Sequence, residues 1–134
     1  MSASTRFLSR LLGLFCLTAA VCMIANGATL LATVTELVHD RPLMLVVGIV
    51  TLFAGLAMVL AHNVWSGGVL TVVVTVIGWL TLAKAVVILL LSPAAMADVY
   101  LFALQGGPMS YLYTAVTAII GVYLTYAGFR GRAP

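Results

Sequence analysis

Four long apolar stretches follow one another along the chain, and polar residues gather between them. The stretches cover residues 7–24, 43–61, 69–91 and 111–129. Each is close to the length of about 20 residues that a helix needs to cross the hydrocarbon core of a bilayer. The pattern predicts an all-α fold, a polytopic membrane bundle of four transmembrane helices that forms one transmembrane domain over residues 1–134.

The connector between the first two stretches is longer than a turn and has an amphipathic pattern. In residues 29–39, Leu30, Val34 and Leu37 share one helical face. Glu36 lies off that face. We predict an interfacial helix here, lying in the plane of the membrane surface. An extended end of the first crossing helix is the alternative.

The connector between the third and fourth stretches carries helix signals of its own. Ser92 is suited to the N-cap, and Pro93 to the first helical position. Residues 94–104, which include Asp98, then form a second predicted interfacial helix, and the glycines and proline at 106–108 end it. An extended crossing helix is again the alternative.

An internal repeat relates the two halves of the chain. Gly13-Leu-Phe-Cys-Leu matches Gly78-Trp-Leu-Thr-Leu, Pro42 matches Pro108, and Gly55 matches Gly121, all at nearly the same offset. We predict two parallel repeats of helix–interfacial helix–helix, over residues 7–62 and 69–129. The second unit would lack a counterpart if the first helix were removed. We therefore interpret residues 7–24 as a retained helix and not as a cleaved signal peptide.

Composition indicates that lipid is the solvent for most of the surface. Hydrophobic residues make up 64% of the 134 residues, and charged residues only 7%. A small soluble domain keeps a large exposed surface, which needs more polar residues than this. The net charge of +3 is not arranged as the continuous basic stripe that binds phosphates, so nucleic acid is not an expected partner.

The arginines predict the topology. Four belong to the side that holds both termini and the link over residues 62–68, namely Arg6, Arg10, Arg130 and Arg132. Arg41 lies on the opposite side, with the connectors. Because cytoplasmic segments carry an excess of Lys and Arg, both termini are predicted to be cytoplasmic.

Lys84 is the residue that most invites a functional interpretation. It lies inside the third stretch, about 6 Å to the connector side of the helix midpoint. An ionisable residue at such a depth costs about 2.5 to 3.5 kcal/mol on insertion scales. In one interpretation its ammonium snorkels to the head groups. In the other, it faces the bundle interior and pairs with a connector carboxylate, with Glu36 expected first and Asp40 or Asp98 as alternatives.

Small residues form stripes on two of the stretches. Residues spaced by seven are Gly48, Gly55 and His62 in the second, and Thr114, Gly121 and Gly128 in the fourth. Small residues at this spacing let helices approach closely, so a homo-oligomer is expected. His62 should face protein as a partner for free carbonyls at the helix end, with Asn63 as the terminating residue. A proton-handling role for His62 is the alternative.

No residue pattern indicates a cofactor, a metal site or a catalytic centre. At either end of one helix, His39 and His62 would lie about 34 Å apart, too far to ligate one haem iron. The chain shows no cluster of metal-ligating residues, no Gly-rich phosphate loop and no nucleophile with a base. Trp65 falls at a predicted membrane interface and is interpreted as an anchor.

Two runs of residues carry a resemblance. They are His62-Asn63-Val64-Trp65 and the run TVIGWLTLAK from Thr75 to Lys84. Together they resemble a family of small bacterial four-helix membrane proteins, whose pattern is HN-x-W followed by IT-x-IGW-x-x-L-x-KG. The chain departs from the pattern at Ala85, where the family has glycine. The resemblance implies a bacterial inner-membrane location, and it does not indicate a mechanism. The positions that it emphasises are His62, Asn63, Trp65, Trp79 and Lys84.

Three classes of function remain. The first is a non-enzymatic membrane component that assembles with itself or with a larger membrane complex, as small size and few polar groups favour. The second is a small transporter or channel for an anion or an acidic amphiphile, which uses Lys84. The third, an enzyme acting on lipid, is disfavoured because no catalytic geometry is evident. A cavity around Lys84 would favour transport, and a dry ion pair would favour a structural role.

Overall fold

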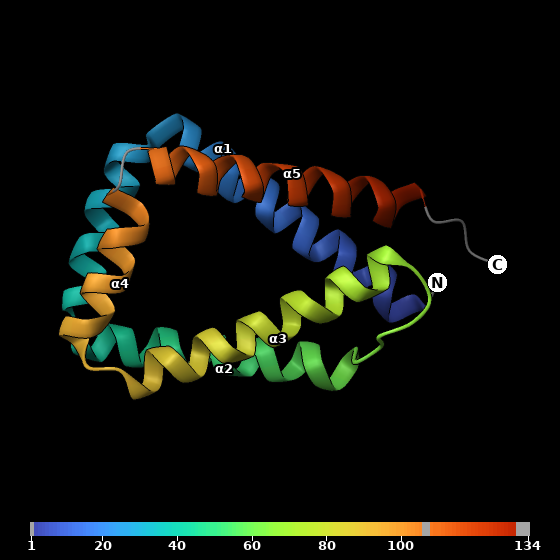
Figure 1. Cartoon of the computed structure of the whole chain (residues 1–134), viewed down its shortest axis with the longest axis horizontal. Coiled ribbons are helices and arrows are strands. Elements are labelled where there is room, and N and C mark those ends of the chain that lie inside the picture. Colours follow the sequence, from blue (N-terminus) through green and yellow to red (C-terminus); the bar gives the residue numbers. More distant parts are fainter. Residues whose placement is uncertain (1, 106–107, 131–134) are drawn as a thin grey trace.

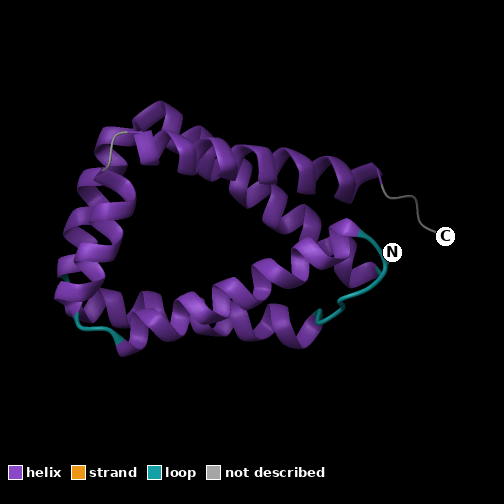
Figure 2. Ribbon diagram, viewed as in Figure 1, coloured by secondary structure: helices purple, strands orange, loops and turns teal. Residues whose placement is uncertain are grey.

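The described part of the chain is built from α-helices. The structure is a computed structural model that describes residues 2–105 and 108–130. Its helices are α1 (Ala3–His39), α2 (Arg41–Ala61), α3 (Val69–Leu90), α4 (Pro93–Gln105) and α5 (Pro108–Arg130) (Figures 1 and 2). Four of them are long and apolar enough to cross a membrane: α1, α2, α3, and α5 over Ser110–Arg130. The predicted all-α fold with four such helices is therefore confirmed for the described residues.

Side-chain caps begin three of these helices. Ser2 Oγ, Asp40 Oδ1 and Ser92 Oγ accept hydrogen bonds from the backbone N–H groups of Thr5, Leu43 and Ala95, at 3.1, 3.0 and 3.3 Å. Each cap satisfies an N–H group that has no partner within its own helix. The predicted start of α4, with Ser92 at the N-cap and Pro93 as the first helical residue, is confirmed. The end predicted at residues 106–108 falls partly outside the described residues.

Helix α1 changes direction at Asn26, whose φ of −139° and ψ of 38° are not helical. Beyond it, residues 27–39, the α1 distal segment, run beside α4 across one end of the molecule (Figure 1). This connector therefore has features of both predicted alternatives, a separate helix and an extended end of the first crossing helix. The segment continues the crossing helix along the chain, but the kink makes it run in a different direction. We call the end of the molecule that holds the α1 distal segment and α4 the connector end. The opposite end, which holds the N-terminus, the link 62–68 and the end of α5, is the terminal end.

The crossing helices pack as two pairs, α1 with α5 and α2 with α3. In the first pair, a Cβ added to Gly121 of α5 would lie 2.9 Å from the backbone nitrogen of Leu17 and 3.1 Å from the Cβ of Cys16. Gly13 of α1 lies in the same way against the backbone of Thr125. The absence of a side chain at these glycines is therefore what lets the two backbones approach.

The second pair repeats this kind of contact. A Cβ on Gly55 of α2 would lie 2.7 Å from the Cα of Leu82 in α3. A Cβ on Gly78 of α3 would lie 3.3 Å from the Cβ of Met58 in α2.

The small-residue stripes are therefore filled within one chain. Gly48 lies against Leu89, Gly128 against Ser9, and Thr114 against the sulfur of Met23. The stripes thus give no support to the expected homo-oligomer, which stays a prediction.

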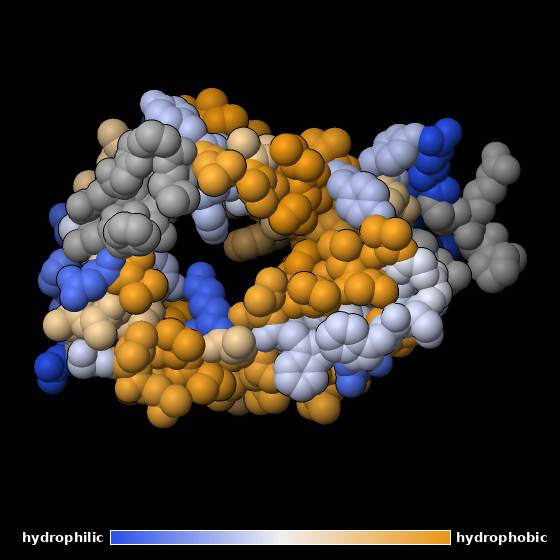
Figure 3. Space-filling view, viewed as in Figure 1, coloured by the Kyte–Doolittle hydropathy of each residue, from blue (hydrophilic) through white to orange (hydrophobic). Residues whose placement is uncertain are grey.

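Two apolar clusters join the pairs, one at each end. The terminal cluster contains Leu8, Leu70, Val74 and Leu124. The connector cluster contains Val38, Met44, Ile88, Met96 and Ala97. Figure 3 shows an opening through the middle of the molecule between these ends, bordered mostly by hydrophobic residues, with hydrophilic atoms on the side of α4. The helix pairs are thus held together at their ends and stand apart in the middle.

Candidate functional site

The link between α2 and α3 is fastened to α3 by buried polar side chains. His62 is the C-cap of α2 and is 3% exposed. Its Nε2 lies 3.3 Å from the carbonyl oxygen of Thr71, to which the ring nitrogen donates. The prediction that His62 faces protein is thus confirmed. The predicted role as a partner for free carbonyls at the end of α2 is wrong, because the Thr71 carbonyl lies in the first turn of α3 and also accepts from Thr75 Oγ1 at 3.1 Å.

Thr75 makes the second contact that holds the link to α3. Its Oγ1 donates to the carbonyl oxygen of Val64 at 2.8 Å and accepts from the N–H of Val64 at 3.3 Å. Thr75 is 1% exposed and Val64 is 41% exposed, so these bonds are partly shielded from water. Sequence reasoning missed Thr71 and Thr75, because threonine in an apolar helix gives no signal of a distant partner.

Asn63 brings the two tryptophans together. Its Oδ1 accepts from Nε1 of Trp65 at 2.9 Å and from Nε1 of Trp79 at 3.3 Å. Trp65 lies in the link and Trp79 lies one turn beyond Thr75 on α3, so one amide oxygen makes a third connection between the link and the helix. The structure therefore gathers four of the residues singled out in the sequence: His62, Asn63, Trp65 and Trp79.

Lys84 lies apart from this group, five residues beyond Trp79 and therefore about 7.5 Å further toward the connector end. The side chain is exposed. Its Nζ lies 5.4 Å from the centroid of the Tyr100 ring on α4. The ammonium thus points from α3 toward α4, over the face of an aromatic ring, where a cation–π contact is favourable.

The ion pair expected between Lys84 and a connector carboxylate is not present among the described residues. The α1 distal segment uses Val34, Leu37 and Val38 to pack on the connector cluster. Glu36 lies two residues from both Val34 and Val38, which turns it about 200° around the helix from them, and it is exposed.

On α4, too, a carboxylate is turned away from the packed face of its helix. Asp98 lies two residues beyond the buried Met96 and is also exposed. Asp40 instead caps α2. The three acidic residues therefore leave Lys84 without a carboxylate.

The terminal end carries a second polar arrangement, which sequence reasoning had interpreted only as a topology signal. Arg10 Nε donates to the carbonyl oxygen of Gly128 at 2.9 Å, and its guanidinium lies 4.6 Å from the Phe129 ring centroid. Ser9 Oγ donates to the carbonyl oxygen of Leu124 at 2.7 Å. Both bonds satisfy carbonyls of the last turns of α5, one of them a carbonyl without a helical partner.

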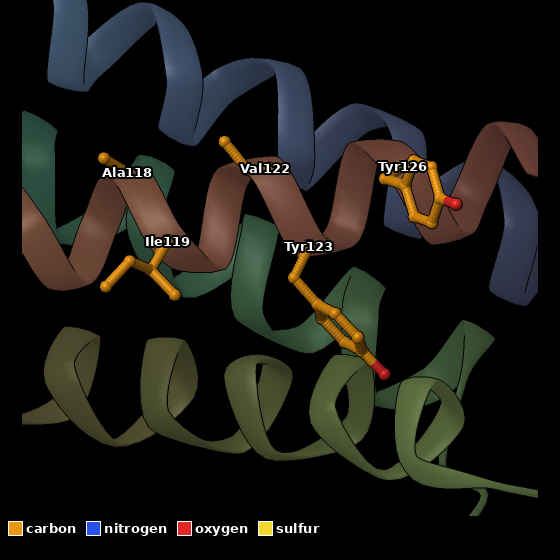
Figure 4. Close-up of a pocket in the computed structure, with 5 residues that line it drawn as sticks. All are labelled: Ala118, Ile119, Val122, Tyr123 and Tyr126. Atoms are coloured by element: carbon orange, nitrogen blue, oxygen red, sulfur yellow. The ribbon is translucent and has the colours of Figure 1, made fainter.

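A shallow apolar hollow of about 470 Å³ lies along α5. Its walls are Ala118, Ile119, Val122, Tyr123 and Tyr126 (Figure 4). In Figure 4 the side chains of Ile119 and Tyr123 extend from α5 toward α3. Within the described residues, no group of three or more His, Cys, Asp or Glu side chains is placed to hold a metal ion.

The chain was compared with known proteins in three ways. No family model, no curated protein and no solved structure matches it. The resemblance to small bacterial four-helix membrane proteins therefore stays a prediction, resting on the residues of the link and of α3.

Proposed function

We propose that the chain is a non-enzymatic integral membrane protein that binds or transports an amphiphile with an acidic head group, whose anion pairs with Lys84. The observation that carries the proposal is the unpaired ammonium. Lys84 lies in an apolar helix that is long enough to cross a membrane, and no carboxylate of the described chain meets it.

Magnitudes support an external anion. A lysine inside a transmembrane segment costs about 2.5 to 3.5 kcal/mol. The contact with the Tyr100 ring returns about 0.5 to 2 kcal/mol, depending on how dry it is. An ammonium has three donors and the ring face satisfies them poorly, so a carboxylate or phosphate of a ligand compensates the rest.

The opening between the helix pairs supports an amphiphile over a small ion. Its border is mostly apolar, with hydrophilic atoms on the side of α4 (Figure 3). That distribution suits a ligand with one charged end and an apolar remainder. The other interpretation of the sequence, self-assembly or service in a larger membrane complex, is a prediction that the small-residue stripes no longer favour.

We also propose two parallel repeats, a bacterial inner-membrane location and cytoplasmic termini. The matching glycines support the repeat, since Gly13 packs on α5 as Gly78 packs on α2, and Gly121 packs on α1 as Gly55 packs on α3. The arginine bias supports the orientation. Reporter fusions at residue 134 that are active only outside the cytoplasm would contradict it.

Binding to the purified protein in nanodiscs tests the function. A long-chain carboxylic acid is compared with the primary alcohol of the same chain length, using equilibrium binding. We expect the acid to bind more tightly, and Lys84→Met to lose about tenfold in affinity for the acid, since a charge-assisted contact is worth about 1.5 to 3 kcal/mol.

Two controls and one transport assay complete the test. Lys84→Arg keeps the cation and should retain binding. Arg41→Gln removes a cation at the connector end outside the crossing stretch and should leave binding unchanged. Uptake of the acid into liposomes, wild type against Lys84→Ala, separates transport from binding. Equal binding of acid and alcohol, or an Lys84→Met variant that binds like wild type, would refute the proposal.

A further inference from the structure

The hollow on α5 has a cation at one end. Tyr126 forms the end of the hollow nearest the terminal end of the molecule, and the Arg130 guanidinium lies 5.0 Å from its ring centroid. Arg130 makes no hydrogen bond or ion pair within the described part of the chain. Its donors are therefore free, whereas the Nε of Arg10 already bonds the carbonyl oxygen of Gly128.

The dimensions of this arrangement fit one leaflet of a bilayer. From Ala118 to Tyr126 the helix rises about 12 Å, and Arg130 lies about 6 Å further along. Half of a hydrocarbon core is about 15 Å. If Arg130 lies at the head groups, the hollow therefore runs through most of the apolar depth of the leaflet at the terminal end.

We propose that this hollow binds one acyl chain of an anionic phospholipid of that leaflet, with the phosphate paired to Arg130. The walls of the hollow that would contact the acyl chain are apolar, apart from the tyrosine hydroxyls. The guanidinium supplies the planar donors that suit a phosphate. Exposure of Ile119, Val122 and Tyr123 at 67, 57 and 41% leaves the hollow open to a chain that enters from the bilayer.

This site is independent of the function proposed for Lys84. Lys84 lies near the connector end, about 9 Å before Leu90 ends α3, and so it belongs to the opposite leaflet. A failure of one proposal leaves the other intact, because the two sites use different cations, different ends of the molecule and different ligands.

Native mass spectrometry of the whole protein tests the proposal. The protein in detergent is mixed with phosphatidylglycerol or with phosphatidylcholine of the same acyl chains, and the lipid that stays bound after the detergent is removed is measured. We expect phosphatidylglycerol to be retained preferentially. Arg130→Gln should weaken its retention about tenfold, as expected for one charge-assisted contact. Retention of phosphatidylcholine should fall much less, because its choline ammonium neutralises the phosphate and leaves no net charge for Arg130 to pair. Ala118→Phe, which fills the hollow, should weaken both lipids.

Arg6→Gln is the matched control, because it removes one positive charge at the same end from a residue outside the hollow. It should retain phosphatidylglycerol like wild type, and so should Lys84→Met. Equal losses in Arg130→Gln and Arg6→Gln would indicate general surface charge and overturn the site. Equal retention of the two lipids, or competition by glycerol phosphate, which lacks acyl chains, would overturn it as well.

Discussion

At the scale of single residues, polar side chains in this apolar chain mainly fasten one segment to another. The buried side chains of Thr75 and His62 hold the link to α3 through hydrogen bonds to Val64 and Thr71. Asn63 does so at the surface through two indole N–H groups. Buried polar groups cost free energy unless they are paired, and each of these is. Lys84, Glu36 and Asp98 were also singled out in the sequence, and the structure leaves all three exposed.

Replacing Thr75 by valine should loosen the link. The change keeps the shape of the side chain and removes both hydrogen bonds to the backbone of Val64, which should cost about 0.5 to 1.5 kcal/mol. Thermal unfolding in detergent should show this loss, and limited proteolysis should cut the link faster. Thr81→Val is the matched control, since its hydroxyl bonds only to Ile77 of its own helix, and it should change the stability by about 0.5 kcal/mol or less. Equal stability of the two variants would contradict this account.

Residue-level predictions from the sequence succeeded where local spacing decides the outcome. The stripe of Gly48, Gly55 and His62 correctly places His62 against protein, because residues seven apart share a helix face. The predicted pairing of Lys84 with Glu36 is wrong. To predict it correctly, one must know how the α1 distal segment is rotated about its own axis. That rotation is set by packing of Val34 and Val38 on the connector cluster, and it turns Glu36 away.

At the scale of elements, hydropathy and capping residues are what predict where the helices begin and end. The predicted stretches 43–61 and 69–91 differ from α2 and α3 by two residues or fewer at either end, because length and apolar content are what lipid demands. The kink at Asn26 was not predicted, although it lies at an Asn-Gly pair, which is a turn signal. Helices tolerate each of these residues at a cost of about 1 kcal/mol or less, so the pair alone does not distinguish a kink from a continuous helix. The kink decides that the α1 distal segment lies beside α4.

Glycine contacts between elements are testable by adding one methyl group. Gly55→Ala should destabilise the protein by about 1 to 3 kcal/mol, because the new Cβ meets the backbone of Leu82, which cannot move aside without separating the helices. Gly121→Ala, at the matching position of the repeat, should cost a similar amount. Gly27→Ala meets nothing within 4 Å and should be neutral or stabilising by up to about 1 kcal/mol. Thermal unfolding in detergent measures all three, and a Gly55→Ala variant as stable as Gly27→Ala would be incompatible with the close crossing.

At the scale of the whole molecule, the pairing of α1 with α5 and of α2 with α3 is what the sequence left open. Helices that are apolar nearly all round give no periodic signal of which face meets which partner. The matched glycines of the two units do lie at these contacts, so part of the signal was present. One sequence by itself does not say which of four glycine-bearing faces meet.

A cross-link within one chain tests this pairing. A Cβ at position 121 lies 3.1 Å from the Cβ of Cys16, a little below the range of about 3.5 to 4.5 Å that disulfides use. In a Cys22→Ser background, Gly121→Cys should form an intramolecular disulfide on mild oxidation, seen as faster migration in a denaturing gel. Gly27→Cys, which points into open space, should not. Dimer bands alone in the Gly121→Cys variant would show that the contact joins two chains.

The pairing of the first crossing helix with the last has a consequence for biosynthesis. Ser9 bonds Leu124 and Arg10 bonds Gly128, across 115 and 118 positions of sequence. Chains are made from the N-terminus, so α2 and α3 can pair as soon as α3 is inserted, whereas α1 lacks its main partner until α5 is inserted. During translation Gly13 and Arg10 therefore face lipid or a chaperone, and contacts this distant in sequence form slowly. The window between insertion of α1 and of α5 is when a newly made chain is most exposed to quality-control proteases and to mispairing with a neighbour.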